Sequence, residues 1–316
     1  ITRLIMIAIA EAYAPATSAN LGVGFDIIGL ALQEPGDTVI AERRAERGVS
    51  IAKIEGDGGR LPLEVSANTA GVAASQVFRA AGADFGAVLT IKKGLPLGSG
   101  LGSSSASAVA GALAANALLE TSVPDAVLLE ASLHGEAVAS GYHVDNVGPA
   151  LFGGLTLFTE PTMAGLVRLP VPSSLFLALV TPDVEVKTSD ARAVLPGNVA
   201  LGTMVRQTGA VARLVDALHR GDVKAMGRAM EGDGVIEAAR KHLIPQFDNS
   251  RAIAHELGAH ALVISGAGPT LLAICEAESV ASRVVDALKA LYLGYGIGCI
   301  GQVARVSEQG ARVVRK

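Results

Sequence analysis

The chain contains the segment Pro96-Leu97-Gly98-Ser99-Gly100-Leu101-Gly102-Ser103-Ser104-Ser105-Ala106, which lies directly before an alanine-rich run ending at Leu119. The run predicts a helix over residues 106–119, and the segment before it predicts a loop. Glycine lets a backbone turn tightly and approach a ligand closely. The loop therefore brings free N–H groups and the positive end of a helix to one place, which is a site for an anion such as phosphate. The serine hydroxyls add donors, or an oxygen for a metal ion.

Two familiar phosphate-binding loops are excluded by the spacing of these glycines. The pattern G-x-x-x-x-G-K-[ST] requires a lysine after its second glycine, and no lysine lies between Gly94 and Leu119. The dinucleotide-binding pattern G-x-G-x-x-G fails because Gly98, Gly100 and Gly102 are separated by single residues. The loop therefore belongs to another class of phosphate site.

The uncharged stretch over residues 94–119 raises one alternative, a helix that spans a membrane. Its first third is rich in Gly, Pro and Ser, and such a backbone would leave polar groups unpaired in lipid. The apolar part, residues 106–119, is too short to cross a bilayer. We therefore expect a buried helix and no membrane partner.

Length and composition predict a folded protein of one large or two ordinary domains. Of the 316 residues, 50% are hydrophobic and 18% are charged, which allows a full hydrophobic core and disfavours disorder. Aromatic residues make up only 3%, and the formal net charge is −4 with no basic run. A stacking surface or a basic patch is therefore not expected, which argues against nucleic acid and anionic membranes as partners.

The cysteines and the first residues bear on localisation. Cys275 and Cys299 lack metal-ligand spacing and lie in apolar runs, so both are predicted to be buried free thiols. So few cysteines in a chain of this length favour a reducing compartment, and we expect the cytoplasm. Residues 3–10 loosely resemble a secretory signal. We favour a first strand over residues 5–13, because no further membrane or disulfide signal follows.

The hydrophobic pattern alternates between strands and helices along the whole chain, which predicts an α+β protein. Up to about residue 164, strands are expected over residues 5–13, 39–43, 49–54, 88–92 and 153–158, and helices over 68–81, 106–119 and 125–140. Beyond residue 165, strands are expected over residues 175–180, 261–265, 270–275 and 298–306, and helices over 188–194, 203–218, 222–239 and 279–291.

A second polar segment lies near the N-terminus, at residues 15–26. It contains two glycines for a tight turn, together with the amide of Asn20 and the carboxylate of Asp26. An ordinary turn would explain the glycines equally well. A carboxylate such as that of Asp26 can pair with an ammonium group.

A third polar segment, residues 136–149, follows the predicted helix over residues 125–140. Glu136 lies on that helix, and His143, Asp145 and Asn146 follow in a loop that begins at a glycine. A carboxylate on a helix is usually only solvated. These residues therefore indicate a site only when they are considered together with the phosphate loop.

The remaining candidates are single residues in otherwise ordinary segments. Arg192 lies on a predicted helix and Arg240 directly follows one, and an arginine at such a place is more often a surface residue than a ligand. Gly266 belongs to the sequence Ser265-Gly-Ala-Gly-Pro-Thr270, which suits any tight hairpin. Asn68 precedes a predicted helix and is a plausible cap for it.

Taken together, the motifs resemble those of the homoserine kinases, in the superfamily that also holds the galactokinases, mevalonate kinases and phosphomevalonate kinases. The phosphate loop matches P-x-x-x-G-L-G-S-S-A, except that Ser105 stands where many members have alanine. Residues 14–26 match A-P-A-T-x-A-N-L-G-x-G-F-D, and the form G-x-H-x-D-N around His143 resembles homoserine kinases specifically. Mevalonate kinases and galactokinases differ here, because they have a catalytic aspartate near the position where this chain has the amide Asn146. The resemblance extends from about residue 14 to residue 310.

The resemblance implies a two-domain fold. Residues 1–164 would form an N-terminal ATP-binding domain with a left-handed βαβ unit, against the strong preference for right-handed crossovers. Residues 165–316 would form a ferredoxin-like C-terminal domain, with the active site between the two. A homodimer is also implied, although no interface can be identified from the sequence.

The resemblance also implies the reaction, transfer of a phosphoryl group from ATP to L-homoserine, and a role for each candidate. The phosphate loop and Asn68 would bind ATP. Glu136 and Ser104 would hold Mg²⁺ and, with Asn146, serve catalysis. The amino acid would be bound by Asn20, Asp26, His143, Asp145, Asn146, Arg192, Arg240 and Gly266.

Two alternatives remain open at this stage. One is a kinase of the same superfamily for another small alcohol, such as mevalonate or shikimate; Asp26 disfavours these because they lack an amino group. The other is a non-catalytic regulatory protein of the same fold. No general base is evident, although His143 and Asp145 are candidates, and we hypothesise that the phosphate itself receives the proton.

Overall fold

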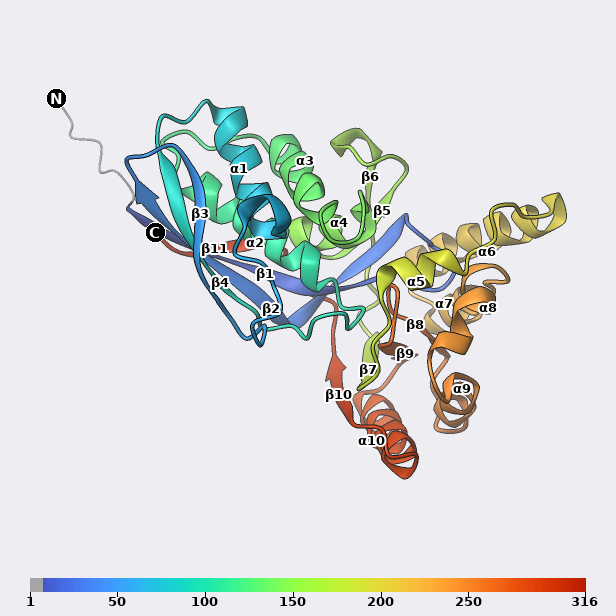
Figure 1. The fold of residues 1–316 in the computed structure, drawn as a ribbon. Coiled ribbons are helices and arrows are strands. Elements are labelled where there is room, and N and C mark those ends of the chain that lie inside the picture. The colour runs from blue at the N-terminus through green and yellow to red at the C-terminus, as the bar shows by residue number, and fades with distance from the viewer. Residues whose placement is uncertain (1–7) are drawn as a thin grey trace.

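The computed structural model describes residues 8–316, which form two β-sheets and their covering helices (Figure 1). The first sheet has seven strands, in the order β11-β1-β2-β4-β3, with β5 beside β2 and β6 beside β5. Its strands are β1 (Ile9–Ala19), β2 (Ile28–Arg44), β3 (Gly48–Glu55), β4 (Gly86–Lys92), β5 (Leu155–Phe158), β6 (Leu166–Leu169) and β11 (Arg312–Arg315).

The helices of the first part gather on one face of this sheet (Figure 1). They are α1 (Thr69–Ala81), α2 (Ser103–Ala117), α3 (Asp125–Glu136) and α4 (Val144–Phe152), with short 3₁₀ turns at Val65–Ala67 and Met163–Gly165. Helix α2 lies in the middle and is buried along almost its whole length. Small residues allow this close packing, because a Cβ at Gly111 would lie only 2.6 Å from the carbonyl oxygen of Ala70.

One strand pair in the first sheet is parallel. Strands β3 and β4 run in the same direction and are connected through α1, whereas the other pairs are antiparallel. This is a βαβ unit at the position that the sequence resemblance implies. The left-handed sense of its crossover stays a prediction.

The second sheet has four antiparallel strands in the order β10-β7-β9-β8. They are β7 (Phe176–Pro182), β8 (Ala261–Ile264), β9 (Leu271–Cys275) and β10 (Cys299–Ala304). Helices separate β7 from β8 and β9 from β10, while β8 and β9 form a hairpin. This order is the βαββαβ arrangement of a ferredoxin-like fold, which confirms that prediction.

The helices of the second part complete the chain. They are α5 (Thr188–Ala193), α6 (Leu201–Arg220), α7 (Val223–Met230), α8 (Ile236–Arg240), α9 (Phe247–Glu256) and α10 (Glu278–Gly294), with a 3₁₀ turn at Lys241–Leu243. Both faces of the second sheet are buried, which explains why β7 is a continuous apolar run. Leu177 and Leu179 join the core shared with the first sheet, whereas Ala178 and Val180 face the core beneath α9 and α10.

Several sequence expectations need correction. The single helix predicted over residues 222–239 is wrong, because Gly232-Asp233-Gly234 separates α7 from α8. The side chain of Asp233 accepts hydrogen bonds from the amides of Val235, Ile236 and Glu237, so it begins a new helix. The residues after His143 form helix α4 rather than a loop, and helix α9 was not predicted. Cys275 is buried, but Cys299 is only partly so.

Other expectations are met or lie outside what is described. The predicted helix over residues 68–81 is α1, and Asn68 caps it. Residues 5–7 of the predicted first strand lie outside the described residues, and β1 begins at Ile9. Within residues 8–316, no helix is long and apolar enough to cross a membrane. Strands β6 and β11, both beyond residue 165, join the first sheet, and the domain boundary after residue 164 stays a prediction.

Candidate active site

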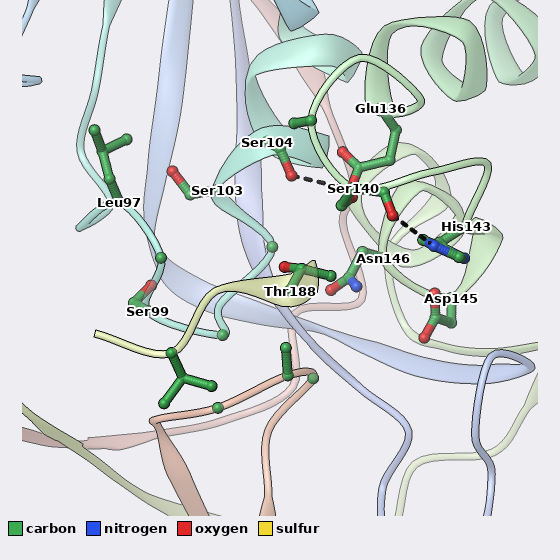
Figure 2. Close-up of a pocket in the computed structure, with 18 of the residues that line it drawn as sticks. Leu97, Ser99, Ser103, Ser104, Glu136, Ser140, His143, Asp145, Asn146 and Thr188 are labelled. Carbon is green, nitrogen blue, oxygen red and sulfur yellow. Dashed lines mark hydrogen bonds between the residues drawn. The ribbon is translucent and has the colours of Figure 1, made fainter. Parts of the chain in front are cut away.

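A cavity lies where the phosphate loop meets the end of α3, the start of α4, helix α5 and the β8–β9 turn (Figure 2). The structure brings most of the predicted residues together there. Lining the cavity are Asn20, Asp26, Leu97, Gly98, Ser99, Gly100, Gly102, Ser103, Ser104, Glu136, His143, Asp145, Asn146, Arg192, Arg240 and Gly266. Four predicted residues are not part of its lining: Asn68, Pro96, Leu101 and Ser105.

The phosphate loop is held by its carbonyl groups. The amide of Thr270 donates to the carbonyl of Ser99 at 3.2 Å, and the hydroxyl of Ser265 donates to that of Gly100 at 2.8 Å. The carbonyl of Leu101 accepts from the amide of Thr17 at 3.1 Å. Within residues 8–316, no group accepts a hydrogen bond from the amides of residues 98–104. The loop therefore leaves its donors for a ligand, as an anion site requires.

Three glycines give the loop this shape. Gly98, Gly100 and Gly102 have φ angles of 66°, 78° and 66°, in the left-handed region that other residues rarely adopt. Gly102 is also sterically required, because a Cβ there would lie 1.9 Å from the hydroxyl oxygen of Thr17. Helix α2 begins directly after Gly102, so its free N–H groups and positive end point to the same place.

Glu136, at the end of α3, is a buried carboxylate with one free oxygen. Its Oε1 accepts hydrogen bonds from the hydroxyls of Ser104, at 2.9 Å, and Ser140. Its Oε2 is buried and has no partner among the described residues. The side chain is only 2% exposed, and burial raises its pKa to about 7. A buried oxygen without a partner is a point where a cation can bind.

Arg192, Asp26 and His143 form a polar cluster on the other side of the cavity. Arg192 Nη2 donates to Asp26 Oδ1 at 2.6 Å and to His143 Nδ1 at 3.1 Å. Because the guanidinium can only donate, Nδ1 of His143 is an acceptor and its Nε2 carries the hydrogen. That Nε2 donates to the carbonyl of Ser140 at 2.7 Å. Burial, and then the charge of Arg192, lower the pKa of His143, which is consistent with a neutral ring.

Arg240 extends this cluster towards the β8–β9 turn. Its Nε donates to the carbonyl of Ala191 at 2.8 Å, and its Nη1 to that of Gly266 at 3.2 Å. The amide of Asn20 donates to the same Gly266 carbonyl at 2.8 Å. The ring of Phe25 lies 5.3 Å from the guanidinium carbon of Arg192 and 5.0 Å from that of Arg240, so it packs against both cations.

Asp145 and Asn146 occupy the first turn of α4 between the two sides of the cavity (Figure 2). The hydroxyl of Thr17 donates to Asn146 Oδ1 at 2.7 Å, which leaves the amide nitrogen for a ligand. Asp145 is 3% exposed, and its Oδ1 has no partner among the described residues. Burial, and next the charge of Asp26, raise its pKa to about 7.

Asn68 is not part of the cavity lining, and its side chain makes three structural hydrogen bonds. Its Oδ1 accepts from the amides of Ala70 and Gly71, and its Nδ2 donates to the carbonyl of Pro62 at 3.0 Å. In its place, Leu61 and Thr69 line the cavity.

The structure adds residues that the sequence analysis missed. They are Phe25, Lys93, Ser107, Ser140 and Thr188, all of which line the cavity. Phe25 stood inside a quoted motif, next to Asp26, so that motif could have indicated it. Lys93 lies just before the phosphate loop, and Thr188 begins the predicted helix that carries Arg192, but no motif marked either residue as part of a site.

The comparisons with known proteins define the class first. The model of the GHMP kinase N-terminal domain matches residues 68–154, and that of the GHMP kinase C-terminal domain matches residues 214–293. The letters stand for the galactokinase, homoserine kinase, mevalonate kinase and phosphomevalonate kinase superfamily. The two halves of the chain, and the cavity between them, are therefore those of a GHMP kinase.

Individual relatives indicate which member of this superfamily the chain is similar to. A homoserine kinase of Chlorobium phaeobacteroides is 40% identical over 89% of this chain and 91% of its own length. One from Xanthomonas campestris is 39% identical over 96% of this chain and 94% of its own length. The crystal structure of a homoserine kinase from Cytophaga hutchinsonii matches 99% of this chain and 100% of its own, with 38% identity and a TM-score of 0.93. The chain belongs to the homoserine kinase family.

Proposed function

We propose that the protein is a homoserine kinase, which transfers the γ-phosphoryl group of ATP to the side-chain hydroxyl of L-homoserine. The products are O-phospho-L-homoserine and ADP. One observation carries the proposal. A single cavity joins a loop rich in free amide donors to a cluster of two arginines and two carboxylates. The first half suits a nucleotide's phosphates, and the second suits a small amino acid.

ATP is the phosphoryl donor expected of a kinase of this family. The amides of residues 98–104 would bind its phosphates. The loop is held in place through the carbonyls of Ser99, Gly100 and Leu101, so its amides stay available. The N-terminus of α2 adds its partial positive charge at the same point. Leu61, Leu97 and Thr69 lie at the side of the cavity where the rest of the nucleotide would extend.

Glu136 and Ser104 would hold Mg²⁺. The free, buried Oε2 of Glu136 and the hydroxyl of Ser104 are hard oxygen donors, which this ion prefers. Among residues 8–316, no group of three or more His, Cys, Asp or Glu could hold a metal ion. Such a set is not needed, because Mg²⁺ at kinase sites takes most of its ligands from phosphates and water. When bound, the ion neutralises charge on the transferring phosphoryl group.

The polar cluster would bind the amino acid. Arg192 and Arg240 are suited to its carboxylate, since a guanidinium pairs with a carboxylate through two parallel hydrogen bonds. Asp26 and Asp145 are suited to its ammonium group. Asn20 and Gly266 hold Arg240 and the β8–β9 turn in place, and His143 does the same for Arg192.

The chemistry needs correct positioning more than covalent help from the protein. The homoserine hydroxyl oxygen forms a bond to the γ-phosphorus, the bond from that phosphorus to the β-phosphate oxygen breaks, and ADP leaves. The hydroxyl proton passes to a phosphate oxygen and then to solvent. Asn146, whose amide nitrogen is free, would orient the hydroxyl. Holding both substrates in line supplies most of the acceleration.

The test is ADP release from ATP and Mg²⁺ with L-homoserine, L-threonine, L-serine, mevalonate and shikimate as alternative acceptors. We expect turnover that strongly favours L-homoserine. Faster turnover of mevalonate or shikimate would refute the substrate assignment while leaving the phosphate site intact. No turnover with any acceptor would instead support a regulatory role. Two further properties stay predictions. One is a homodimer, which the molecular mass in solution would test, and the other is a cytoplasmic location.

A further inference from the structure

We propose that the buried ion pair between Lys93 and Asp37 is a positioning device that fixes both ends of the phosphate loop. Asp37 lies in β2, and Lys93 follows directly after β4, so the pair joins two neighbouring strands beneath the loop. The inference rests on the proposed function only in that the loop is taken to bind the phosphates of a nucleotide.

Asp37 holds the start of the loop. Its Oδ1 accepts hydrogen bonds from the amides of Gly94, at 3.0 Å, and Leu95, at 3.3 Å. The backbone is also tight at this point, because a Cβ at Gly94 would lie 2.1 Å from the carbonyl oxygen of Gly36. The chain therefore leaves β4 in a fixed direction.

Lys93 holds the end of the loop. Its Nζ donates to the carbonyl of Ser103 at 2.9 Å and to the hydroxyl of Ser107 at 2.7 Å, both in the first turns of α2. The hydroxyl of Ser107 then donates to Asp37 Oδ2 at 2.7 Å, and Lys93 donates to the same oxygen. Asp37, Lys93 and Ser107 therefore form a closed set of hydrogen bonds beside the first turns of α2.

The contacts argue for positioning rather than direct binding. All three donors of the Lys93 ammonium are used within the protein. Its side chain is 1% exposed and that of Asp37 is 0% exposed, and the two charges cancel. Lys93 therefore has no donor left for a phosphate, although it is one of the residues that line the cavity.

A buried ion pair is also a poor choice for stability alone. Burial costs both charges their hydration, and an apolar pair of similar volume often stabilises a protein equally well. An apolar pair, however, cannot bind the amides of Gly94 and Leu95 or the carbonyl of Ser103. Between these anchors lies a loop with three glycines in the left-handed region, which has much conformational freedom to lose. Its amides converge on one point only if its ends are fixed.

The test measures nucleotide affinity and stability separately. The variants are Ser107→Ala, Lys93→Met, Asp37→Asn and the apolar double variant Asp37→Leu/Lys93→Met. Affinity for ADP and ATP with Mg²⁺ is measured by calorimetry, without homoserine. Val284→Ala is the control, because Val284 lies on the buried face of α10 and does not line the cavity, and loss of its methyl groups lowers stability through a small void.

We expect the Kd for nucleotide to rise about 10- to 100-fold in Lys93→Met and Asp37→Asn, as for a displaced binding group, and less in Ser107→Ala. The double variant should recover thermal stability but keep the weakened affinity. The Val284→Ala control should lose stability and bind nucleotide as the wild type does. In variants that turn over, the KM for homoserine should change much less than that for ATP.

Three outcomes would overturn the inference. The pair is only structural if the double variant binds nucleotide as tightly as the wild type. The same holds if Val284→Ala weakens binding as much as Lys93→Met does. It also fails if Ser107→Ala, the mildest change, leaves the affinity for ATP unaltered. A wild type that binds nucleotide but phosphorylates no homoserine would refute the proposed function and leave this inference standing.

Discussion

Replacement of Glu136 by Gln is expected to stabilise the ligand-free protein while removing its activity. Burial raises the pKa of Glu136 from its ordinary value of 4.5 to about 7, so the folded protein resists ionisation of this carboxyl group. The difference corresponds to a destabilisation of roughly 3 kcal/mol when the group is ionised. Glutamine cannot ionise, but its buried amide would lack a partner, which costs about 1 kcal/mol. The net gain is therefore about 2 kcal/mol.

The stability gain of Glu136→Gln over the wild type should grow as the pH rises. Below pH 4.5, Glu136 is protonated in both the folded and the unfolded protein, and its burial brings no charge penalty. As the pH rises from there to about 7, the unfolded protein loses this proton first, and the wild type loses stability. Above about pH 7 the full penalty is present. The variant should therefore exceed the wild type at pH 8 by about 2 kcal/mol and match it near pH 5.

Thermal unfolding of both proteins at pH 5 and pH 8 measures this effect, with an expected rise in Tm of about 3 °C at pH 8. Glu130→Gln is the matched control, because Glu130 lies on the same helix with its side chain 68% exposed. The kcat of Glu136→Gln should fall about 100-fold or more, as when a charge-stabilising group is lost. An equal change in stability at both pH values would refute the argument that the penalty comes from a buried charge.

The remaining predictions concern the loop and the amino-acid cluster. Gly102→Ala should abolish activity, because its Cβ would lie 1.9 Å from the hydroxyl oxygen of Thr17. At Gly98 an added Cβ meets nothing within 4 Å, so Gly98→Ala should lower the free energy of unfolding by only about 1 kcal/mol, because of the positive φ. Unfolding and turnover measurements on both variants check this difference. Arg192→Met should raise the KM for homoserine about 10- to 100-fold and leave that for ATP nearly unchanged, which steady-state kinetics checks. Asp145→Asn should weaken homoserine binding without abolishing turnover at saturating homoserine; loss of kcat with normal binding would show that Asp145 is a base.

Local signals made much of the fold predictable from the sequence. The spacing of the loop glycines and the alanine-rich run indicated the loop and α2, and Asn68 correctly marked the start of α1. The break between α7 and α8 was missed because the apolar pattern continues through it. The turn signal Gly232-Asp233-Gly234 was overlooked, and in the structure the Asp233 side chain accepts hydrogen bonds from three following amides at the start of the new helix.

The site was predictable where motifs mark it and not where distant segments meet. The sequence indicated both Asp26 and Arg192, but not their pairing, because 166 positions separate them along the chain. Lys93 and Asp37 are 56 positions apart, Asp37 within β2 and Lys93 directly after β4, so no spacing rule joins them. Asn68 was assigned to the nucleotide by resemblance, and this role stays a prediction; in the structure its side chain caps α1 and donates to the preceding turn.

The geometry bears directly on whether a general base is needed. A base must offer a free lone pair to the attacking hydroxyl. His143 offers none, because its Nδ1 accepts from Arg192 and its Nε2 donates to the carbonyl of Ser140. Asn146 is an amide and is not basic. Asp145 has a free buried oxygen, but burial raises its pKa to about 7, so near neutral pH it is ionised in only part of the molecules. If Asp145 binds the ammonium group as proposed, that charge would favour the ionised carboxylate and also occupy it, which supports the hypothesis that the phosphate receives the proton.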